Sequence, residues 1–398
     1  MRMHVRGAKC AAGFCAAFLL SASSAALAGT TYAEKTLWTF NGTDGNEALY
    51  GNVVLDIGGD VYGTTATGGA ENSGTVFRVN SDGTEDTLYT FTGGADGSFP
   101  SGTLLLDGSG NIYGTASGTV WMLTNNANTY SFSTLATFPN SGYSYAGVIM
   151  DKKGNLYGTE VAGGDSGYGA VYEITAKGKY KPLHPFDGAA GGANPYAGVI
   201  MDKKGNLYGT TFGGGDHGFG TVYRLAPDGT YNVLYSFKGT DGQTVFDGAQ
   251  PTGGLVADKN GNMYGTTNTG GTVNDGTAFE ITAAGAYQSL WSFGAGTNKH
   301  KPPDGGDPKD TPILAGGVLY ITTAGGGANG QGAVISLVPG AKSDKELYSF
   351  CAPNGGCGGG VTPYAGLAVD GAGNLYGVTA AGGDANYNSG AVFELVKQ

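Results

Sequence analysis

Short apolar runs separated by turn residues recur along the chain, at steps of about 50 residues. The clearest unit is AGVIMDKKGNLYGT at residues 146–159, and it returns letter for letter at residues 197–210. GVIMD is rich in branched apolar side chains, KKGN contains a glycine that permits positive φ, and LYGT is a second strand-like run. The unit therefore predicts a β-hairpin. Five further copies of its second half begin at Gly59, Gly110, Gly261, Gly317 and Gly373.

Two more strand-like runs follow each hairpin. In one unit they are TVYRL at residues 221–225 and VLYSF at residues 233–237. Four strands in about 50 residues are typical of a β-propeller blade. Seven copies of the hairpin motif thus predict an all-β chain, a seven-bladed β-propeller of four-stranded antiparallel blades.

The fourth strand of the last unit is displaced to the other end of the chain. TLWTF at residues 36–40 precedes the first hairpin, whereas the last unit stops after its third strand, at Gln398. Pairing the two ends would close the ring and leave no unpaired sheet edge there. We therefore expect the N-terminal strand to complete the last blade.

Several residues recur at fixed places in the unit. A tyrosine in each second strand and a phenylalanine ending each fourth strand should fill the space between blades, although a ring of sugar-stacking aromatics is the alternative. Glycines that open the first strand should permit close backbone approach at the axis. An aspartate ending the first strand should cap the turn, whereas a calcium site would need several converging oxygen ligands. The tyrosines are Tyr62, Tyr113, Tyr157, Tyr208, Tyr264, Tyr320 and Tyr376; the phenylalanines are Phe40, Phe91, Phe138, Phe186, Phe237, Phe293 and Phe350; the glycines are Gly147, Gly198, Gly254 and Gly366; and the aspartates are Asp56, Asp107, Asp151, Asp202, Asp258 and Asp370.

Residues 1–28 have the three parts of a secretory signal peptide. Arg2, Arg6 and Lys9 are basic, an apolar stretch follows, and the small-residue cleavage site ALA ends at Ala28. We expect cleavage near Ala28 and a periplasmic or secreted protein. Residues 29–398 would then form a single propeller domain.

The net charge excludes some classes of partner. It is −11 for the whole chain and becomes more negative once the three leader cations are lost, which disfavours nucleic acid and anionic lipid. No other stretch approaches the 18 apolar residues of a membrane span, so none is expected in the mature chain. We expect a monomer without metal or cofactor, with a glycan or an exported protein as partner.

Two cysteines follow the leader, Cys351 and Cys357, in the sequence SFCAPNGGCGGG. In an oxidising compartment this spacing favours a disulfide that closes a small loop. A metal or redox pair is the alternative, but no histidine lies beside them.

A binding site is expected on the face that carries the long, variable loops, near the axis, because function usually sits on variable loops held by a rigid scaffold. The catalytic candidates are Asp216 and His217, an adjacent pair that could act as an orienting group and a base. Asp165, Asp275 and Asp384, together with this pair, are the candidate ligand-binding residues. Adjacent Asp and His residues in a glycine loop more often reflect plain solubility, and the chain has no nucleophile-elbow, zinc-protease or phosphate-loop motif.

The repeat GNLYGTT…GTVYRL…LYSF…AGL resembles the GloVer-type tandem repeat of exported bacterial proteins, over nearly the whole chain after the leader. The resemblance implies an exported repeat protein and no particular activity. Such repeats often precede a C-terminal surface anchor. This chain ends at Lys397 and Gln398 without a sorting tail, so we expect a soluble periplasmic or secreted form.

Three functions are compatible with these features. The first is a binding scaffold that recognises a glycan or protein through its variable loop face. The alternative is a polysaccharide- or metabolite-acting hydrolase or lyase with a site at the axial mouth, which fold analogy alone supports. The third is a purely structural surface protein. The scarcity of catalytic residue types leaves enzyme activity open and favours the scaffold.

Overall fold

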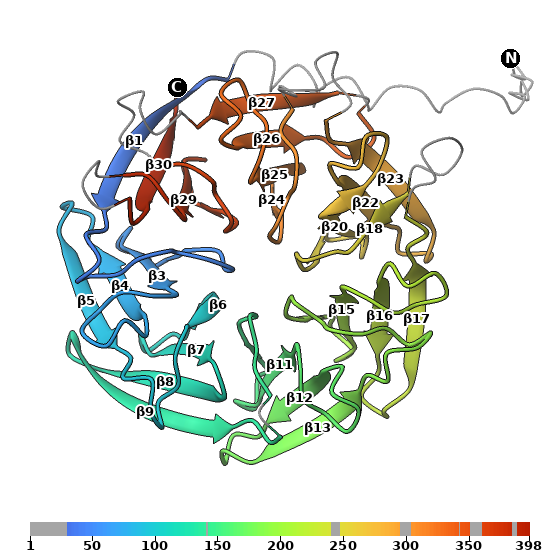
Figure 1. Cartoon of the computed structure of the whole chain (residues 1–398), viewed down its shortest axis with the longest axis horizontal. Coiled ribbons are helices and arrows are strands. Elements are labelled where there is room, and N and C mark those ends of the chain that lie inside the picture. The colour runs from blue at the N-terminus through green and yellow to red at the C-terminus, as the bar shows by residue number, and fades with distance from the viewer. Residues whose placement is uncertain are drawn as a thin grey trace, which may run out of the picture.

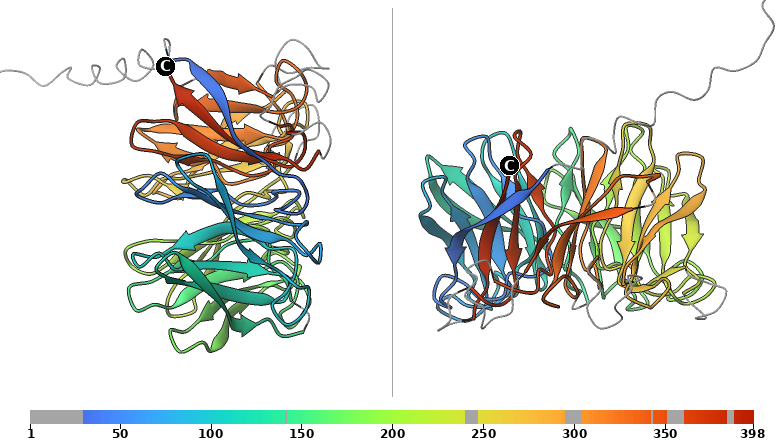
Figure 2. Two further views of the ribbon diagram at one scale, coloured as in Figure 1. Left: turned by 90° about the vertical axis from the view of Figure 1, so that its left-hand side faces the viewer. Right: turned by 90° about the horizontal axis from the view of Figure 1, so that it is seen from above.

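The computed structural model describes residues 30–140, 142–239, 247–294, 304–341, 343–350, 360–383 and 388–398. Within these ranges the chain forms seven four-stranded antiparallel sheets, arranged in a ring (Figure 1). Seen from the side, the ring is a short disc whose strands run between its two faces (Figure 2). The predicted seven-bladed all-β propeller is confirmed.

Each blade is one sheet, and its first strand lies nearest the axis. The strands of blades 1 to 4 are, in order, β2 Val54–Leu55, β3 Val61–Thr65, β4 Thr75–Val79 and β5 Glu85–Thr90; β6 Ser101–Leu106, β7 Ile112–Ala116, β8 Thr119–Asn126 and β9 Thr129–Thr137; β10 Ile149–Met150, β11 Leu156–Glu160, β12 Ala170–Ile174 and β13 Tyr180–Pro185; and β14 Ile200–Met201, β15 Leu207–Thr211, β16 Thr221–Leu225 and β17 Tyr231–Ser236. Those of blades 5 to 7 are β19 Val256–Ala257, β20 Met263–Thr267, β22 Thr277–Ile281 and β23 Tyr287–Ser292; β24 Ile313–Ala315, β25 Val318–Thr323, β26 Ala333–Leu337 and β27 Asp344–Ser349; and β28 Ala368–Val369, β29 Leu375–Thr379, β30 Ala391–Lys397 and β1 Tyr32–Thr39. A separate two-stranded sheet joins β18 Gly248–Ala249 to β21 Thr269–Gly270.

The two ends of the chain meet in blade 7. Strand β1 pairs antiparallel with β30, from Tyr32 opposite Lys397 to Thr39 opposite Ala391. Figure 1 shows the blue β1 beside the red β30 at the outer edge of the ring. The predicted closure by an N-terminal strand is confirmed, and it joins the first and last parts of the chain through backbone hydrogen bonds.

The apolar core lies between blades. In the cluster between blades 3 and 4, Val171 and Phe186 come from one blade, and Val199 and Tyr223 from the next. The rings of Phe186 and Tyr223 meet edge to face, with centroids 5.4 Å apart, and Tyr157 packs against the same cluster. All seven phenylalanines that end fourth strands are buried. The prediction that the recurring rings pack between blades is confirmed.

In six of the seven blades, an aspartate before the first turn caps that turn. In blade 4, Oδ1 of Asp202 accepts backbone hydrogen bonds from Lys204 at 2.8 Å and Asn206 at 2.9 Å. Its Oδ2 accepts from the Asn206 amide at 2.7 Å and the Tyr208 hydroxyl at 3.1 Å. The same pair of backbone bonds recurs at Asp56, Asp107, Asp151, Asp258 and Asp370. The capping prediction is confirmed.

Some predicted features lie outside the described residues. They are the signal peptide, the cysteines Cys351 and Cys357, and the candidate Asp384. The described part of the chain contains no helix with the length and apolar character needed to cross a membrane.

Candidate functional site

The loops between second and third strands place the predicted site residues on different blades. Asp165 lies in blade 3 and is exposed, and so are Asp216 and His217 in blade 4. The backbone N–H of Asp216 donates to the Ser236 hydroxyl at 2.8 Å, which anchors this loop to its own blade. Among the described residues, no hydrogen bond or ion pair joins any of these candidates to another.

Asp275, in blade 5, has a different environment. It lines a cavity of about 380 Å³ with Thr272, Val273 and Gly294. Burial raises the pKa of Asp275, and the nearby charges of Asp304 and Asp307 add to the rise. The described residues contain no group of three or more His, Cys, Asp or Glu side chains placed to hold a metal ion.

A ring of side chains that sequence analysis did not single out lies at the axis. The link entering each blade reaches the axis just before the first strand. At the position six residues before the turn aspartate, the side chain is tyrosine in four blades and lysine in one. In blade 6 the equivalent position is found from the pairing of Ile313 with Tyr320. The seven residues are Tyr50, Ser101, Tyr145, Tyr196, Thr252, Lys309 and Tyr364.

The axial tyrosines contact one another. The ring of Tyr145 lies 5.2 Å from that of Tyr50 and 5.6 Å from that of Tyr196, and the latter pair is stacked within 13°. These rings are partly exposed. Burial raises the pKa of Tyr50, and Tyr364 and Tyr196 add to the rise.

A cation and an acid complete this mouth. The Nζ atom of Lys309 lies 6.0 Å from the centre of the Tyr364 ring and 2.8 Å from an Asp307 carboxylate oxygen. The next residue, Asp310, stands where the other six blades have glycine or alanine. Its carboxylate accepts backbone hydrogen bonds from Thr311 at 2.6 Å and Gly366 at 3.1 Å.

The pKa of Asp310 reflects two opposing effects. Burial raises it, and the surrounding backbone N–H groups limit the rise because they stabilise the charged form. A small cavity of about 40 Å³ opens here, and Tyr50, Tyr145, Tyr196, Lys309 and Asp310 contribute to its lining. The mouth therefore offers three aromatic rings and one charge of each sign to a ligand.

Hydrogen bonds between blades hold these axial links in place. The first threonine after the Tyr-Gly pair of a second strand donates to the carbonyl of the next link, as Thr159 does to Ala197 at 2.9 Å and Thr266 to Asp310 at 3.2 Å. Equivalent bonds join Thr115 to Ala146, Thr210 to Gly253 and Thr322 to Ala365. Five of the seven axial links are thus held by the blade before their own.

Glycine is required where the links crowd together. A β-carbon on Gly147 would collide with the carbonyl group of Thr103. One on Gly254 would lie 2.9 Å from the Thr311 hydroxyl, and one on Gly366 would lie 2.8 Å from the Thr311 carbonyl oxygen. The prediction that these glycines permit close approach at the axis is confirmed.

The arrangement suits recognition better than hydrolysis. The usual glycosidase mechanism needs two carboxyl groups on either side of the scissile bond. The described lining of the axial cavity supplies one, Asp310, and no candidate acid from the second-to-third-strand loops lines it. Aromatic rings with a few convergent polar groups are instead the usual content of a binding site.

The comparison with known sequence families concerns the repeats. Residues 115–305 match the sequence model of the Gloeobacter/Verrucomicrobia repeat. The repeats in this part of the chain belong to that family. The matched residues span the second strand of blade 2 to the link that enters blade 6, so the family repeat supplies part of the axial ring, from Tyr145 to Thr252.

Solved structures share the fold of this chain. A catalytically inactive virginiamycin B lyase from Staphylococcus aureus, with quinupristin, is 14% identical with a TM-score of 0.59, over 92% of this chain and 99% of that one. The extracellular domain of a hybrid two-component system from B. thetaiotaomicron is 11% identical with a TM-score of 0.60, over 91% of this chain and 39% of that one. A puromycin hydrolase is 14% identical with a TM-score of 0.53, over 87% and 52%. These likenesses concern the fold alone. No curated protein matches this chain in sequence.

Proposed function

We propose that the protein is a binding scaffold that recognises a glycan at the axial mouth of its loop face. One observation carries the proposal: rings of adjacent tyrosines, partly exposed, surround a mouth that also holds Lys309 and Asp310. Function has to be argued from such a site, because propellers host unrelated activities.

The chemistry of the mouth matches that of a sugar. A pyranose ring has apolar faces that pack on aromatic side chains, and a polar rim that exchanges hydrogen bonds with hydroxyl, carboxylate and ammonium groups. Tyr50, Tyr145 and Tyr196 supply both kinds of surface in one residue type. A cavity of about 40 Å³ is too small to enclose a sugar ring, so the glycan would lie across the mouth.

The cellular setting is part of the proposal. The repeat family and the leader-like residues 1–28 support an exported protein, whether periplasmic or secreted. An exported scaffold would meet glycans or other exported proteins there. A protein ligand would use the same mouth together with the variable loops around it.

Thermal unfolding of the purified protein against a panel of neutral and charged oligosaccharides tests this function. A ligand that binds only the folded state stabilises it by about 2.7 kcal/mol at 100 times its Kd. Tyr196→Phe and Asp310→Asn keep the packing of the mouth but remove a hydroxyl or a charge, and each should weaken binding about 10-fold. The melting temperature of Tyr196→Phe without ligand should stay near that of the parent. Asp310→Asn should lower it, because the asparagine amide sets a donor against the backbone N–H of Thr311 or Gly366.

Asp216→Asn and His217→Ala are the matched controls, because both residues are exposed on the same face outside the mouth. These controls should bind as tightly as the parent. Loss of binding in the controls alone would move the site to the loops. Turnover of a bound oligosaccharide would show that the protein is an enzyme.

A further inference from the structure

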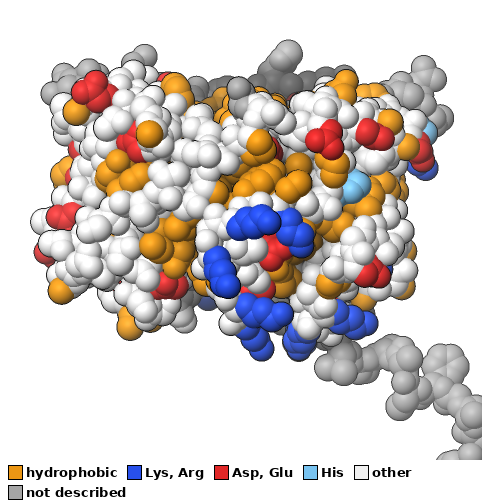
Figure 3. All heavy atoms as spheres, turned by 90° about the horizontal axis from the view of Figure 1, so that it is seen from below, with side chains coloured by type: hydrophobic (Ala, Val, Ile, Leu, Met, Phe, Trp, Pro, Cys, Tyr) orange, Lys and Arg blue, Asp and Glu red, His pale blue; other side chains and the backbone are white. Residues whose placement is uncertain are grey.

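Lysines gather on the face opposite the axial mouth. They occupy the short turns and the adjoining outer strand of blades 3 and 4, and we call them the lysine face. All seven are exposed, and Figure 3, which views the ring edge-on, shows Lys and Arg side chains gathered toward one of its two faces. The seven residues are Lys152, Lys153, Lys177, Lys179, Lys181, Lys203 and Lys204. They are a third of the 21 cations of a chain whose net charge is −11, so the positive charge is concentrated locally.

These charges are largely uncompensated. Among the described residues, Lys181 is the one member that forms an ion pair, with Glu173 at 3.2 Å. Arg224 of blade 4 adds a further cation to the neighbouring strand. Its strand partner is Asn232, and within the described part of the chain the guanidinium Nε has no hydrogen-bond acceptor.

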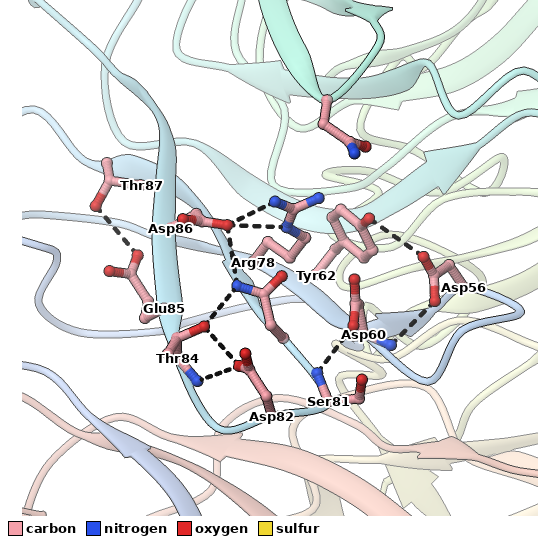
Figure 4. Close-up of polar contacts among 12 residues, drawn as sticks. Asp56, Asp60, Tyr62, Arg78, Ser81, Asp82, Thr84, Glu85, Asp86 and Thr87 are labelled. Atoms are coloured by element: carbon pink, nitrogen blue, oxygen red, sulfur yellow. Dashed lines mark hydrogen bonds and ion pairs between the residues drawn. The ribbon is translucent and has the colours of Figure 1, made fainter.

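Blade 1 shows what a compensated version of the same surface looks like. There the equivalent arginine, Arg78, pairs with Asp86 across the strands, with Nη2 2.5 Å from a carboxylate oxygen. Figure 4 shows this pair beside further acids, Asp60 and Asp82, on the turns of that blade. Blade 4 keeps an acid at the position of Asp82, Asp228, but has Asn232 where blade 1 has Asp86. Arg224 therefore lacks the partner that Arg78 has, and a ligand could supply it.

A groove runs between the two lysine-bearing blades. Its volume is about 310 Å³. Tyr157, Lys181 and Pro182 line it on the side of blade 3, and Gly205 and Pro227 line it on the side of blade 4. Its lining also includes two acids, Asp228 and Glu173, the partner of Lys181. The excess positive charge comes from the exposed turns of the two identical hairpins, which carry Lys152 and Lys153 in blade 3 and Lys203 and Lys204 in blade 4.

We propose that the lysine face binds an acidic polysaccharide across the exposed turns of blades 3 and 4. Carboxylates spaced along the polymer would pair with the lysine ammonium groups, and the sugar rings would rest against the tyrosine and proline surfaces of the groove. This binding is separate from the axial mouth, because the turns that carry the lysines and the links that form the mouth lie on opposite faces.

Other polyanions fit the surface less well. Insertion into a membrane surface needs exposed apolar anchors beside the cations. Of the exposed large apolar side chains of the described residues in blades 3 and 4, Val233 lies on an outer strand, whereas Tyr168 and Phe219 lie in loops of the opposite face. Single-stranded nucleic acid is bound through exposed aromatic platforms, which these turns lack. Anionic membranes and single-stranded nucleic acid therefore serve as comparison ligands in the test.

The test measures binding of the full-length protein to polygalacturonate, a linear polymer of carboxylated sugars. Expected results are binding at low salt, at least a 10-fold loss between 50 mM and 500 mM NaCl, and no binding to uncharged dextran of similar length. A variant that combines four substitutions should weaken binding at least 10-fold. The substitutions are Lys152→Gln, Lys153→Gln, Lys203→Gln and Lys204→Gln. The matched control changes four exposed lysines outside the lysine face: Lys35→Gln, Lys238→Gln, Lys259→Gln and Lys397→Gln.

The control variant loses the same total charge, so it should bind within about 2-fold of the parent. Equal loss in both variants would overturn the proposal, because it would show an effect of net charge only. Equal or tighter binding to phosphatidylserine vesicles or to a single-stranded oligonucleotide would also overturn it, as would no binding to polygalacturonate. The mouth variants Tyr196→Phe and Asp310→Asn should bind polygalacturonate as the parent does, which separates this result from failure at the mouth.

Discussion

The hydroxyl of Thr210, in the second strand of blade 4, donates a 3.0 Å hydrogen bond to the Gly253 carbonyl oxygen in the link that enters blade 5. Thr210 is fully buried, so no water can replace the bond if the hydroxyl is removed. Four other blades make the equivalent bond. Blade 7 has Val378 at this position, which shows that a valine fits the site sterically.

Thr210→Val should therefore destabilise the protein by about 1–3 kcal/mol, because it leaves a buried carbonyl without a donor while keeping the shape of the side chain. Urea unfolding measures the change. Thr134→Val is the control, because Thr134 is exposed on the outer strand of blade 2, and it should change the free energy of unfolding by less than about 0.5 kcal/mol. A similar cost at both sites would mean that the bond between blades contributes nothing of its own.

The axial glycines give a second prediction. A β-carbon on Gly147 would collide with backbone atoms of Thr103, and the backbone of a neighbouring blade cannot move without opening the ring. Gly147→Ala should cost about 3 kcal/mol, at the upper end of the range for overpacking. Gly371, in a turn of blade 7, has no positive φ, and a β-carbon added to it would meet no atom within 4 Å. Gly371→Ala should be neutral or stabilising by up to about 1 kcal/mol.

Thermal and urea unfolding of both alanine variants provide the comparison. Equal destabilisation of the two variants would contradict the crowding argument, since glycine content rather than contact at the axis would then set the cost. Circular dichroism spectra should show the same strand content in both.

The features that sequence analysis predicted are local or periodic. The turn around Asp202 depends on residues within one hairpin, and ring closure by the strand at Thr36–Phe40 follows from counting apolar runs. Tyr145 was missed because its contacts with Tyr50 and Tyr196 join links from three separate blades. A signal was present: aligning the units on the turn aspartate places tyrosine at one link position in four of seven copies.

The candidate residues chosen from glycine loops show the opposite problem. Asp165, Asp216 and His217 have the right chemistry for a site, but second-to-third-strand loops project from the middle of each blade rather than from its inner edge. Whether side chains from different blades converge depends on their distance from the ring axis, and the hydrophobic pattern of the sequence does not encode that distance. The groove of the lysine face was missed for a related reason, because it requires Lys181 and Pro227 of neighbouring blades to face each other.

A buried acid in blade 3 gives the third prediction. Glu160 occupies the position that holds Thr211 in blade 4, and it is fully buried. One carboxylate oxygen accepts a 2.5 Å hydrogen bond from the Tyr180 hydroxyl, and the other has no partner among the described residues. Burial raises the pKa of Glu160 to about 7, and the bond from Tyr180 opposes the rise without cancelling it.

The sign of the pH dependence follows from this shift. The folded protein binds the proton more tightly than the unfolded chain, whose glutamate keeps its ordinary pKa of 4.5. The contribution of Glu160 to stability is therefore most favourable below pH 4.5, falls as the pH rises to about 7, and is constant above that. A shift of this size corresponds to a cost of about 3 kcal/mol at pH 8.

Glu160→Gln removes the ionisation and keeps an oxygen that can accept from Tyr180. We expect this variant to be more stable than the parent at pH 8, by up to about 3 kcal/mol, and to match it within about 1 kcal/mol at pH 4.5. Urea unfolding at both pH values measures the difference. Glu173→Gln is the control, because that carboxylate pairs with an exposed Lys181 at the surface, and its effect should stay below about 1 kcal/mol at either pH. If Glu160→Gln gave the same stability difference at pH 4.5 and pH 8, the carboxyl group of Glu160 would have to ionise alike in the folded and unfolded chains, and its burial would carry no electrostatic cost.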